Sequence, residues 1–144
     1  MIKQIPMDRI KILQVIGRLQ FGGMQGGVIK VDNHIDRDIF HPLLVSFRGF
    51  DQPLKNNLAP DVEFAVIQRK AGRDWRLVRK LANIFVKQRV DIVHSHNWET
   101  WLYSFPAARL AHLPVFILGE YGREATYLSE RGLKQKCGIQ IRVK

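Results

Sequence analysis

The segment best suited to binding a ligand is rich in glycine and follows the first apolar run of the chain. Residues 17–27 contain five glycines and come directly after residues 10–16. Glycine leaves backbone amides uncovered, and a helix N-terminus that follows a strand is a common anion site in α/β proteins. Gly22 and Gly23 are therefore candidates for binding a phosphate group. The spacing fits neither the dinucleotide motif GxGxxG nor the phosphate loop GxxxxGKS/T, so an ordinary flexible turn is the alternative.

A second candidate cluster ends the fourth apolar run, where residues 91–97 read Asp-Ile-Val-His-Ser-His-Asn. Successive side chains of a strand point to opposite faces, so His94 and His96 share one side and Ser95 takes the other. We interpret His94 as a core histidine and His96 as a site residue at the strand end, with Asn97 beside it. Two histidines at this spacing can also bind a metal. No carboxylate or cysteine at a suitable spacing completes the ligand set, so we expect no metal.

The turn after the fifth apolar run carries two further candidates. Glu120 and Tyr121 stand between two glycines, so a tight turn can present the carboxylate or the phenol to a ligand. An ordinary turn into a last helix is the alternative.

Short apolar runs alternate with segments of helical period or with turn residues. The runs that predict strands are residues 10–16, 43–47, 63–67, 91–94 and 115–118. This alternation predicts a doubly wound parallel sheet in a Rossmann-like three-layer α/β/α domain. With the strand order 3-2-1-4-5, the first and fourth strands are neighbours at the switch point, and ligands bind at the carboxyl ends there. The glycine-rich segment and His96 are therefore expected to face one crevice.

Four helices are expected between these strands. The residues that predict the buried face of the first helix are Met24, Val28, Val31 and Ile35. Asp32 should point away from that face. The second helix has room for one or two turns over residues 54–58, and the third begins with Asp74 as its cap. The fourth covers residues 98–111 and begins with Asn97 as its cap.

The net charge of +10 is concentrated in a few places. Residues 69–89 contain eight basic residues and one acidic residue, and a second basic group lies near the C-terminus. On the third helix, the residues expected to form an exposed basic patch are Arg76, Arg79, Lys80 and Lys87. The members of the C-terminal group are Arg131, Lys134, Lys136, Arg142 and Lys144. A solvated helix face, an anionic membrane surface and nucleic acid are three explanations of the patch. Nucleic acid is not expected, because no helix-turn-helix, zinc-finger or RNP signature accompanies the charge.

Length and composition indicate one compact domain. A chain of 144 residues can bury roughly 68–70% of the surface of its unfolded state. No apolar stretch approaches the roughly 20 residues of a membrane span. The single cysteine, Cys137, excludes an internal disulfide and fits a reducing compartment. We therefore expect a cytoplasmic protein, with peripheral contact to the inner membrane through the basic patch as an open alternative.

Several of these segments in combination resemble a known family. The segments are residues 11–16, 22–24, 34–38, 91–97 and 119–123. Together they look like the N-terminal domain of a retaining glycosyltransferase of the GT-B type, family four. Bacterial enzymes that build exopolysaccharide or envelope glycans belong to this group, and the resemblance covers essentially the whole chain.

The resemblance implies two Rossmann-like domains that face a cleft. It also implies transfer of a sugar from a nucleotide-sugar donor to a glycan or lipid-linked acceptor, with retention and with no metal or other cofactor. Gly22 and Gly23 would approach the donor diphosphate, and His96 and Asn97 would line the acceptor side. The catalytic candidates are His96, Glu120 and Tyr121.

Two positions depart from the family pattern. Gly26 follows Gln25 where a basic residue is common, and Tyr121 stands where a histidine is usual. A phenol with a pKa near 10 cannot replace an imidazole at neutral pH. The donor domain of such enzymes does not fit in 144 residues, so the chain is expected to be the acceptor-side half and inactive alone. A stand-alone α/β module that binds a phosphate-bearing ligand without catalysis is the alternative.

Overall fold

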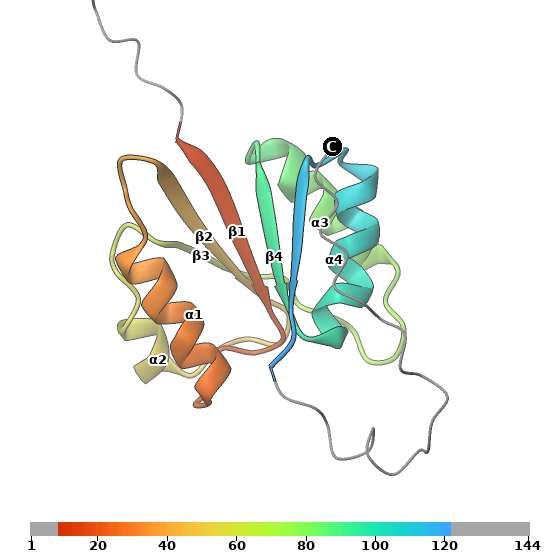
Figure 1. The fold of residues 1–144 in the computed structure, drawn as a ribbon. Helices are drawn as coiled ribbons and strands as arrows, with labels where there is room; N and C mark the ends of the chain where they lie inside the picture. Colours follow the sequence, from red (N-terminus) through yellow and green to blue (C-terminus); the bar gives the residue numbers. More distant parts are fainter. Residues whose placement is uncertain (1–8, 122–144) are drawn as a thin grey trace, which may run out of the picture.

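The computed structural model describes residues 9–121 and shows a parallel sheet between two layers of helices (Figure 1). The strands are β1 (Ile10–Ile16), β2 (Phe40–Ser46), β3 (Glu63–Val66), β4 (Ile92–His96) and β5 (Val115–Gly119). The helices are α1 (Gly23–His34), α2 (Gln52–Asn56), α3 (Arg76–Lys87) and α4 (Trp98–Leu110). Cys137 and the basic group near the C-terminus lie outside the described residues.

The five strands are all parallel and follow the order β3-β2-β1-β4-β5. This order confirms the predicted doubly wound sheet. Strands β2 and β3 are added on one side of β1, and strands β4 and β5 on the other. At this switch point, Gln14 of β1 pairs with His94 of β4 and Val15 with Ser95. The carboxyl ends of these strands therefore meet at one edge of the sheet, as the strand order requires.

Each face of the sheet has its own apolar core. The larger core lies under α3 and α4 and contains fully buried residues such as Leu13, Phe47 and Phe85. The smaller core lies under α1 and α2 and includes Leu44 and Leu54. Figure 1 shows α1 and α2 on one side of the sheet and α3 and α4 on the other.

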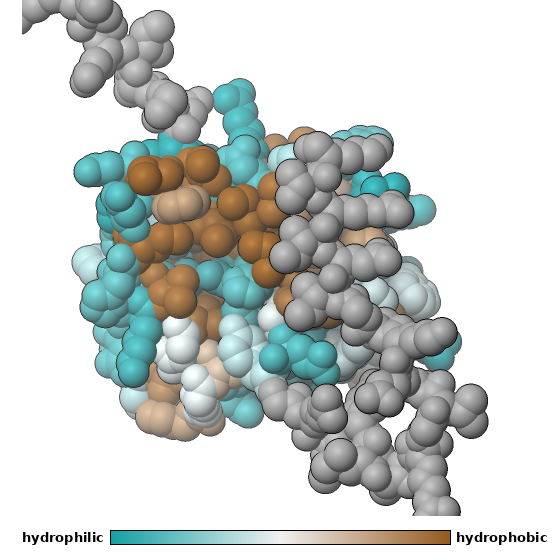
Figure 2. Space-filling view, in the orientation of Figure 1, coloured by the Kyte–Doolittle hydropathy of each residue, from teal (hydrophilic) through white to brown (hydrophobic). Residues whose placement is uncertain are grey.

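The smaller core leaves part of its face open. Ile10 of β1 and Ile117 of β5 are 38% and 39% exposed. The space-filling view shows an exposed apolar area over the strands, bordered by hydrophilic surface (Figure 2). Among the described helices, α1 and α2 thus cover the β2 side of this face more fully than the β5 side.

The buried face of α1 differs from the sequence expectation. Val28, Ile29 and Asp32 are buried, whereas Val31 is 50% exposed. The buried stripe follows the spacing 28, 29 and 32, which is equally consistent with the helical period. The expectation that Asp32 points away from the core was wrong. The rotation of α1 on the sheet turns position 32 inward, although the polarity of its side chain favours solvent.

α3 has the expected amphipathic pattern but a different start. Its buried side is formed by Leu77, Val78, Leu81, Ala82 and Phe85. The N-cap position is taken by Trp75, and no side chain of the described residues caps this N-terminus. Asp74 instead accepts a hydrogen bond from the backbone N–H of Lys70, at 3.0 Å. The expected capping role of Asp74 was therefore wrong, because its carboxylate closes the preceding loop.

Among residues 9–121, none of the helices combines the length and the apolarity that a membrane crossing needs.

Candidate functional site

The glycine-rich segment lies where the sequence placed it, between β1 and the N-terminus of α1. Gly22 is the N-cap in an extended conformation, and no side chain of the described residues caps this end. Its first backbone N–H groups have no partner within the helix. A Cβ on Gly23 would meet no atom within 4 Å, so the backbone there is open to a ligand. Gln25 folds back over Gly22, and its side-chain amide donates to the carbonyl of Arg18 at 3.4 Å.

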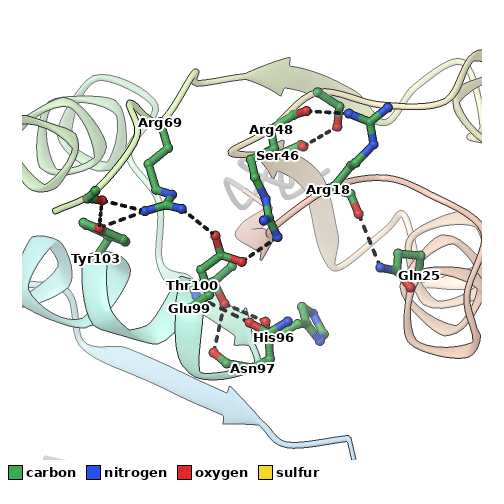
Figure 3. Close-up of polar contacts among 12 residues, drawn as sticks. Arg18, Gln25, Ser46, Arg48, Arg69, His96, Asn97, Glu99, Thr100 and Tyr103 are labelled. Carbon is green, nitrogen blue, oxygen red and sulfur yellow. Dashed lines mark hydrogen bonds and ion pairs between the residues drawn. The ribbon is translucent and has the colours of Figure 1, made fainter. Parts of the chain in front are cut away.

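A cluster of charged side chains crosses the same edge of the sheet (Figure 3). Arg48, after β2, places Nη2 2.7 Å from Oε2 of Glu99, in the first turn of α4. Arg69, after β3, contacts the other carboxylate oxygen at 3.3 Å. Gly17 makes room for the pair, because a Cβ there would lie 3.0 Å from Glu99 and 3.1 Å from Arg48. Two guanidinium groups on one carboxylate leave a local surplus of positive charge, which suits an anionic ligand.

The end of β4 separates its side chains between the two faces, as predicted. The rings of His94 and His96 are 4.0 Å apart on one face. Ser95, on the other, donates a hydrogen bond to Oγ1 of Thr100 in α4, at 2.8 Å. Thr100 Oγ1 in turn donates to the carbonyl of His96 at 2.6 Å. These hydroxyl bonds fix the start of α4 against the strand end.

His96 is buried and has a partner on each ring nitrogen. Its exposed fraction is 1%. Nε2 lies 2.6 Å from Oε1 of Gln14, and Nδ1 lies 3.0 Å from the hydroxyl of Tyr121. Burial, with a smaller contribution from His94, lowers the pKa of His96 to about 3. The imidazole is therefore neutral at physiological pH.

Tyr121 folds back over the histidines from the turn after β5. Its ring stacks on His96 with centroids 5.4 Å apart, and partial burial raises its pKa. Gly119 permits this fold, because a Cβ there would lie 3.0 Å from His94 and 3.1 Å from the tyrosine ring. Tyr121 itself is 54% exposed, and Glu120 is also exposed. The structure thus brings Tyr121 to His96 and leaves Glu120 at the surface of the turn.

Asn97 begins α4 in a strained backbone conformation. Its φ of 76° and ψ of 172° belong to a region that is almost restricted to glycine. The side chain accepts a hydrogen bond from the backbone N–H of Thr100, at 3.5 Å, and the backbone N–H donates to Gly119 at 2.9 Å. Such strain costs about 1–3 kcal/mol and is found mainly at functional sites. The expected N-cap is confirmed.

We expect Asn97→Gly to be more stable than the wild-type chain by about 1 kcal/mol, because glycine adopts this conformation without strain and loses little as an N-cap. Asn97→Ala keeps the strain and loses the cap, so it should be less stable by about 1 kcal/mol. Urea unfolding of the three proteins measures both differences. Equal destabilisation by the two substitutions would show that the backbone at Asn97 is unstrained.

The basic patch lies on the outer side of α3. All four of its residues are exposed. Trp75, which precedes the helix, and Val86, near its end, are 54% and 62% exposed. The surface of α3 therefore combines cationic groups with apolar side chains.

Five residues of this region were missed by reasoning from the sequence. They are Gln14, Asp32, Arg48, Arg69 and Glu99. Gln14 could have been noticed as the polar residue in an otherwise apolar strand interior, and Asp32 by its spacing of four from Val28. The ion pairs of Glu99 join segments far apart in the chain, and no local pattern indicates them.

Solved structures with the same fold include proteins of different kinds. A glycosyltransferase from Rickettsia africae ESF-5 superimposes with a TM-score of 0.65 and 21% identity, over 84% of this chain and 33% of that one. The C-terminal domain of the PF1911 hydrogenase from Pyrococcus furiosus gives a TM-score of 0.54 and 15% identity, over 81% of this chain and 97% of that one. At these identities the likeness concerns the fold. The chain spans about a third of the length of the Rickettsia glycosyltransferase.

Comparison with curated proteins gave no match. The model of the family described as Glycosyltransferase Family 4 matches residues 21–134, which is most of the chain. The match includes the glycine-rich start of α1, the histidines of β4 and the turn after β5. The predicted resemblance is thereby confirmed, and the chain belongs to Glycosyltransferase Family 4.

Proposed function

We propose that this chain is the acceptor-side, N-terminal domain of an enzyme that transfers a sugar from a nucleotide-sugar donor to a glycan or lipid-linked acceptor. The observation that carries the proposal is the pairing of β1 with β4 in a family-four domain, which brings the uncapped N-terminus of α1 and the histidines of β4 to one edge of the sheet. Transfer requires both substrates in one cleft, and orientation can supply roughly 7–11 kcal/mol of the barrier. We therefore propose that the chain alone is inactive and needs a donor domain.

Gly22 and Gly23 are the proposed contacts for the donor diphosphate. The uncapped N-terminus of α1 offers backbone N–H groups and the positive end of the helix dipole to an anion. No acidic residue lies in the first turn of α1. The nearby arginine cluster at Arg48 and Arg69 adds positive charge at the same edge.

His96, Tyr121, Asn97 and Glu120 are the proposed residues of the acceptor side. The raised pKa of Tyr121 keeps the phenol protonated, so it acts as a hydrogen-bond donor and not as a base at neutral pH. His96 is neutral and offers one nitrogen as an acceptor. Glu120 is exposed in the same turn and is available to an acceptor hydroxyl.

The basic patch is proposed to bring the domain to the anionic inner membrane surface, where lipid-linked acceptors are located. Exposed cations next to Trp75 and Val86 fit a shallow membrane contact, since aromatic and cationic side chains both favour the interface.

A substitution in the first turn of α1 tests the donor site through the binding of uridine diphosphate to the 144-residue chain. Titration with uridine diphosphate, followed by amide NMR, should give a dissociation constant of about 1 mM, with the largest shifts at Gly22 and Gly23. Gly23→Asp should abolish these shifts, because a carboxylate there repels the phosphates. Gly27→Asp is the matched control on the same helix, since added Cβ atoms at both positions meet nothing within 4 Å.

Equal loss in the two variants would contradict a diphosphate site at Gly22 and Gly23. Binding at micromolar concentration would favour the alternative function, a stand-alone module for a phosphate-bearing ligand. Release of nucleotide from a nucleotide-sugar by the purified chain, above a heat-inactivated control, would contradict the need for a donor domain.

A further inference from the structure

The most unusual feature of the core is a buried carboxyl group without a hydrogen-bond partner. Asp32 in α1 has an exposed fraction of 0%, and neither of its carboxyl oxygens has a partner among the described residues. A group of this kind costs stability, so its retention calls for an explanation. The side chain that lies against it is Gln14, which also contacts His96.

The contacts of His96 determine where its proton lies. Gln14 presents its carbonyl oxygen to Nε2 at 2.6 Å, and a carbonyl only accepts, so Nε2 must carry the hydrogen. A neutral imidazole has one N–H, which leaves Nδ1 as an acceptor. Nδ1 accordingly accepts from the hydroxyl of Tyr121.

The orientation of the Gln14 amide connects Asp32 to the tautomer of His96. With its carbonyl toward His96, the amide NH₂ is left for Asp32, whose pKa it lowers although the contact falls short of a hydrogen bond. If the amide rotated, its NH₂ would face Nε2 and the proton of His96 would move to Nδ1. An ionised carboxylate at position 32 opposes this rotation, because it can only accept hydrogen bonds and the carbonyl of Gln14 would then face it.

We propose that Asp32 and Gln14 are positioning residues that hold His96 as the Nε2–H tautomer, so that Nδ1 presents a hydrogen-bond acceptor on the side where Tyr121 lies. The inference rests on the proposed function in one respect, namely that the occupant of this position is a substrate hydroxyl. In the structure the hydroxyl of Tyr121 occupies it, from an exposed side chain that a sugar hydroxyl can displace. On this proposal, the burial of Asp32 lowers the stability of the fold and in return fixes the position of the proton on His96.

The tautomer can be measured directly in this chain by long-range ¹H–¹⁵N correlation of the histidine ring, above about pH 8, where the Asp32 carboxyl, with its pKa of about 7, is ionised. In the wild type we expect a protonated Nε2 and an unprotonated Nδ1. Asp32→Leu removes the oxygen, so Gln14 can rotate and the Nδ1–H form should become populated. Asp74→Leu, at a buried aspartate under the other face, controls for general loosening of the fold.

Tyr121→Phe separates the two sides of the imidazole. It removes the hydroxyl on Nδ1, so the Nδ1 signal should shift while the proton stays on Nε2. A wild-type proton on Nδ1, an Asp32→Leu spectrum equal to the wild type, or a change of tautomer in Tyr121→Phe would each overturn the proposal. None of these results depends on binding of uridine diphosphate, so this inference and the donor site can fail separately.

Discussion

The stability of Asp32→Asn relative to the wild type should increase as the pH rises. Burial raises the pKa of Asp32 from 3.8 to about 7, although Gln14 and Arg37 lower it in part. The folded state therefore binds a proton more tightly than the unfolded state. The asparagine variant has almost the same shape and cannot ionise.

The direction of the pH effect follows from linkage. Below the unfolded pKa of 3.8 the carboxyl is neutral in both states and carries no ionisation penalty. As the pH rises toward about 7, the unfolded state releases its proton first, so the wild type loses stability. Between about pH 5 and about pH 8 this loss amounts to about 2–3 kcal/mol, at 1.36 kcal/mol per pKa unit.

Urea unfolding of the wild type and of Asp32→Asn at the two pH values gives the change in their difference, in which other titrating groups cancel. Asp74→Asn is a control of opposite sign. The backbone N–H of Lys70 holds the pKa of Asp74 below its usual value, so this substitution should destabilise the chain at neutral pH and less so in acid. A difference between wild type and Asp32→Asn that does not change with pH would contradict a raised pKa at Asp32.

Removal of the basic patch should weaken binding to anionic vesicles by about a thousandfold at low salt. Each exposed cation near such a surface contributes about 1 kcal/mol, so four contribute about 4 kcal/mol. The variant carries glutamine at Arg76, Arg79, Lys80 and Lys87. Binding of the wild type should also weaken as salt rises, since the Debye length falls to about 8 Å at physiological ionic strength. Vesicle sedimentation at both salt concentrations measures the effect.

A charge-matched control is needed, because a net charge of +10 attracts anionic surfaces without a specific site. The control variant carries glutamine at Arg9, Lys11, Lys30 and Lys55. Arg9 and Lys11 lie at the start of β1, and Lys30 and Lys55 belong to α1 and α2. Their removal lowers the net charge by the same amount. Docking through α3 predicts a large loss only in the patch variant. Equal losses in both variants would reduce the patch to a solvated helix face.

Local pattern was sufficient for the architecture. Apolar runs of strand length, separated by helical or turn segments, correctly predicted the parallel sheet, its order and the pairing of the first strand with the fourth. Strand alternation also placed His94 and His96 together and Ser95 opposite. The combination of these segments indicated the family, and the family model agrees. These properties follow from sequence because periodicity and turn chemistry act over a few residues.

Contacts between distant segments were decided only by the tertiary structure. The side chain of Asp32 is buried because helix packing on the sheet set the rotation of α1, although Val31 offered an equally good apolar stripe. The partners of His96 come from β1 and from the turn after β5, which are separated by about a hundred residues. Glu99 likewise joins the loops after β2 and β3. A sequence determines which side chains are polar, but the proton of His96 and the charge of Asp32 depend on burial and on neighbours that only folding brings together.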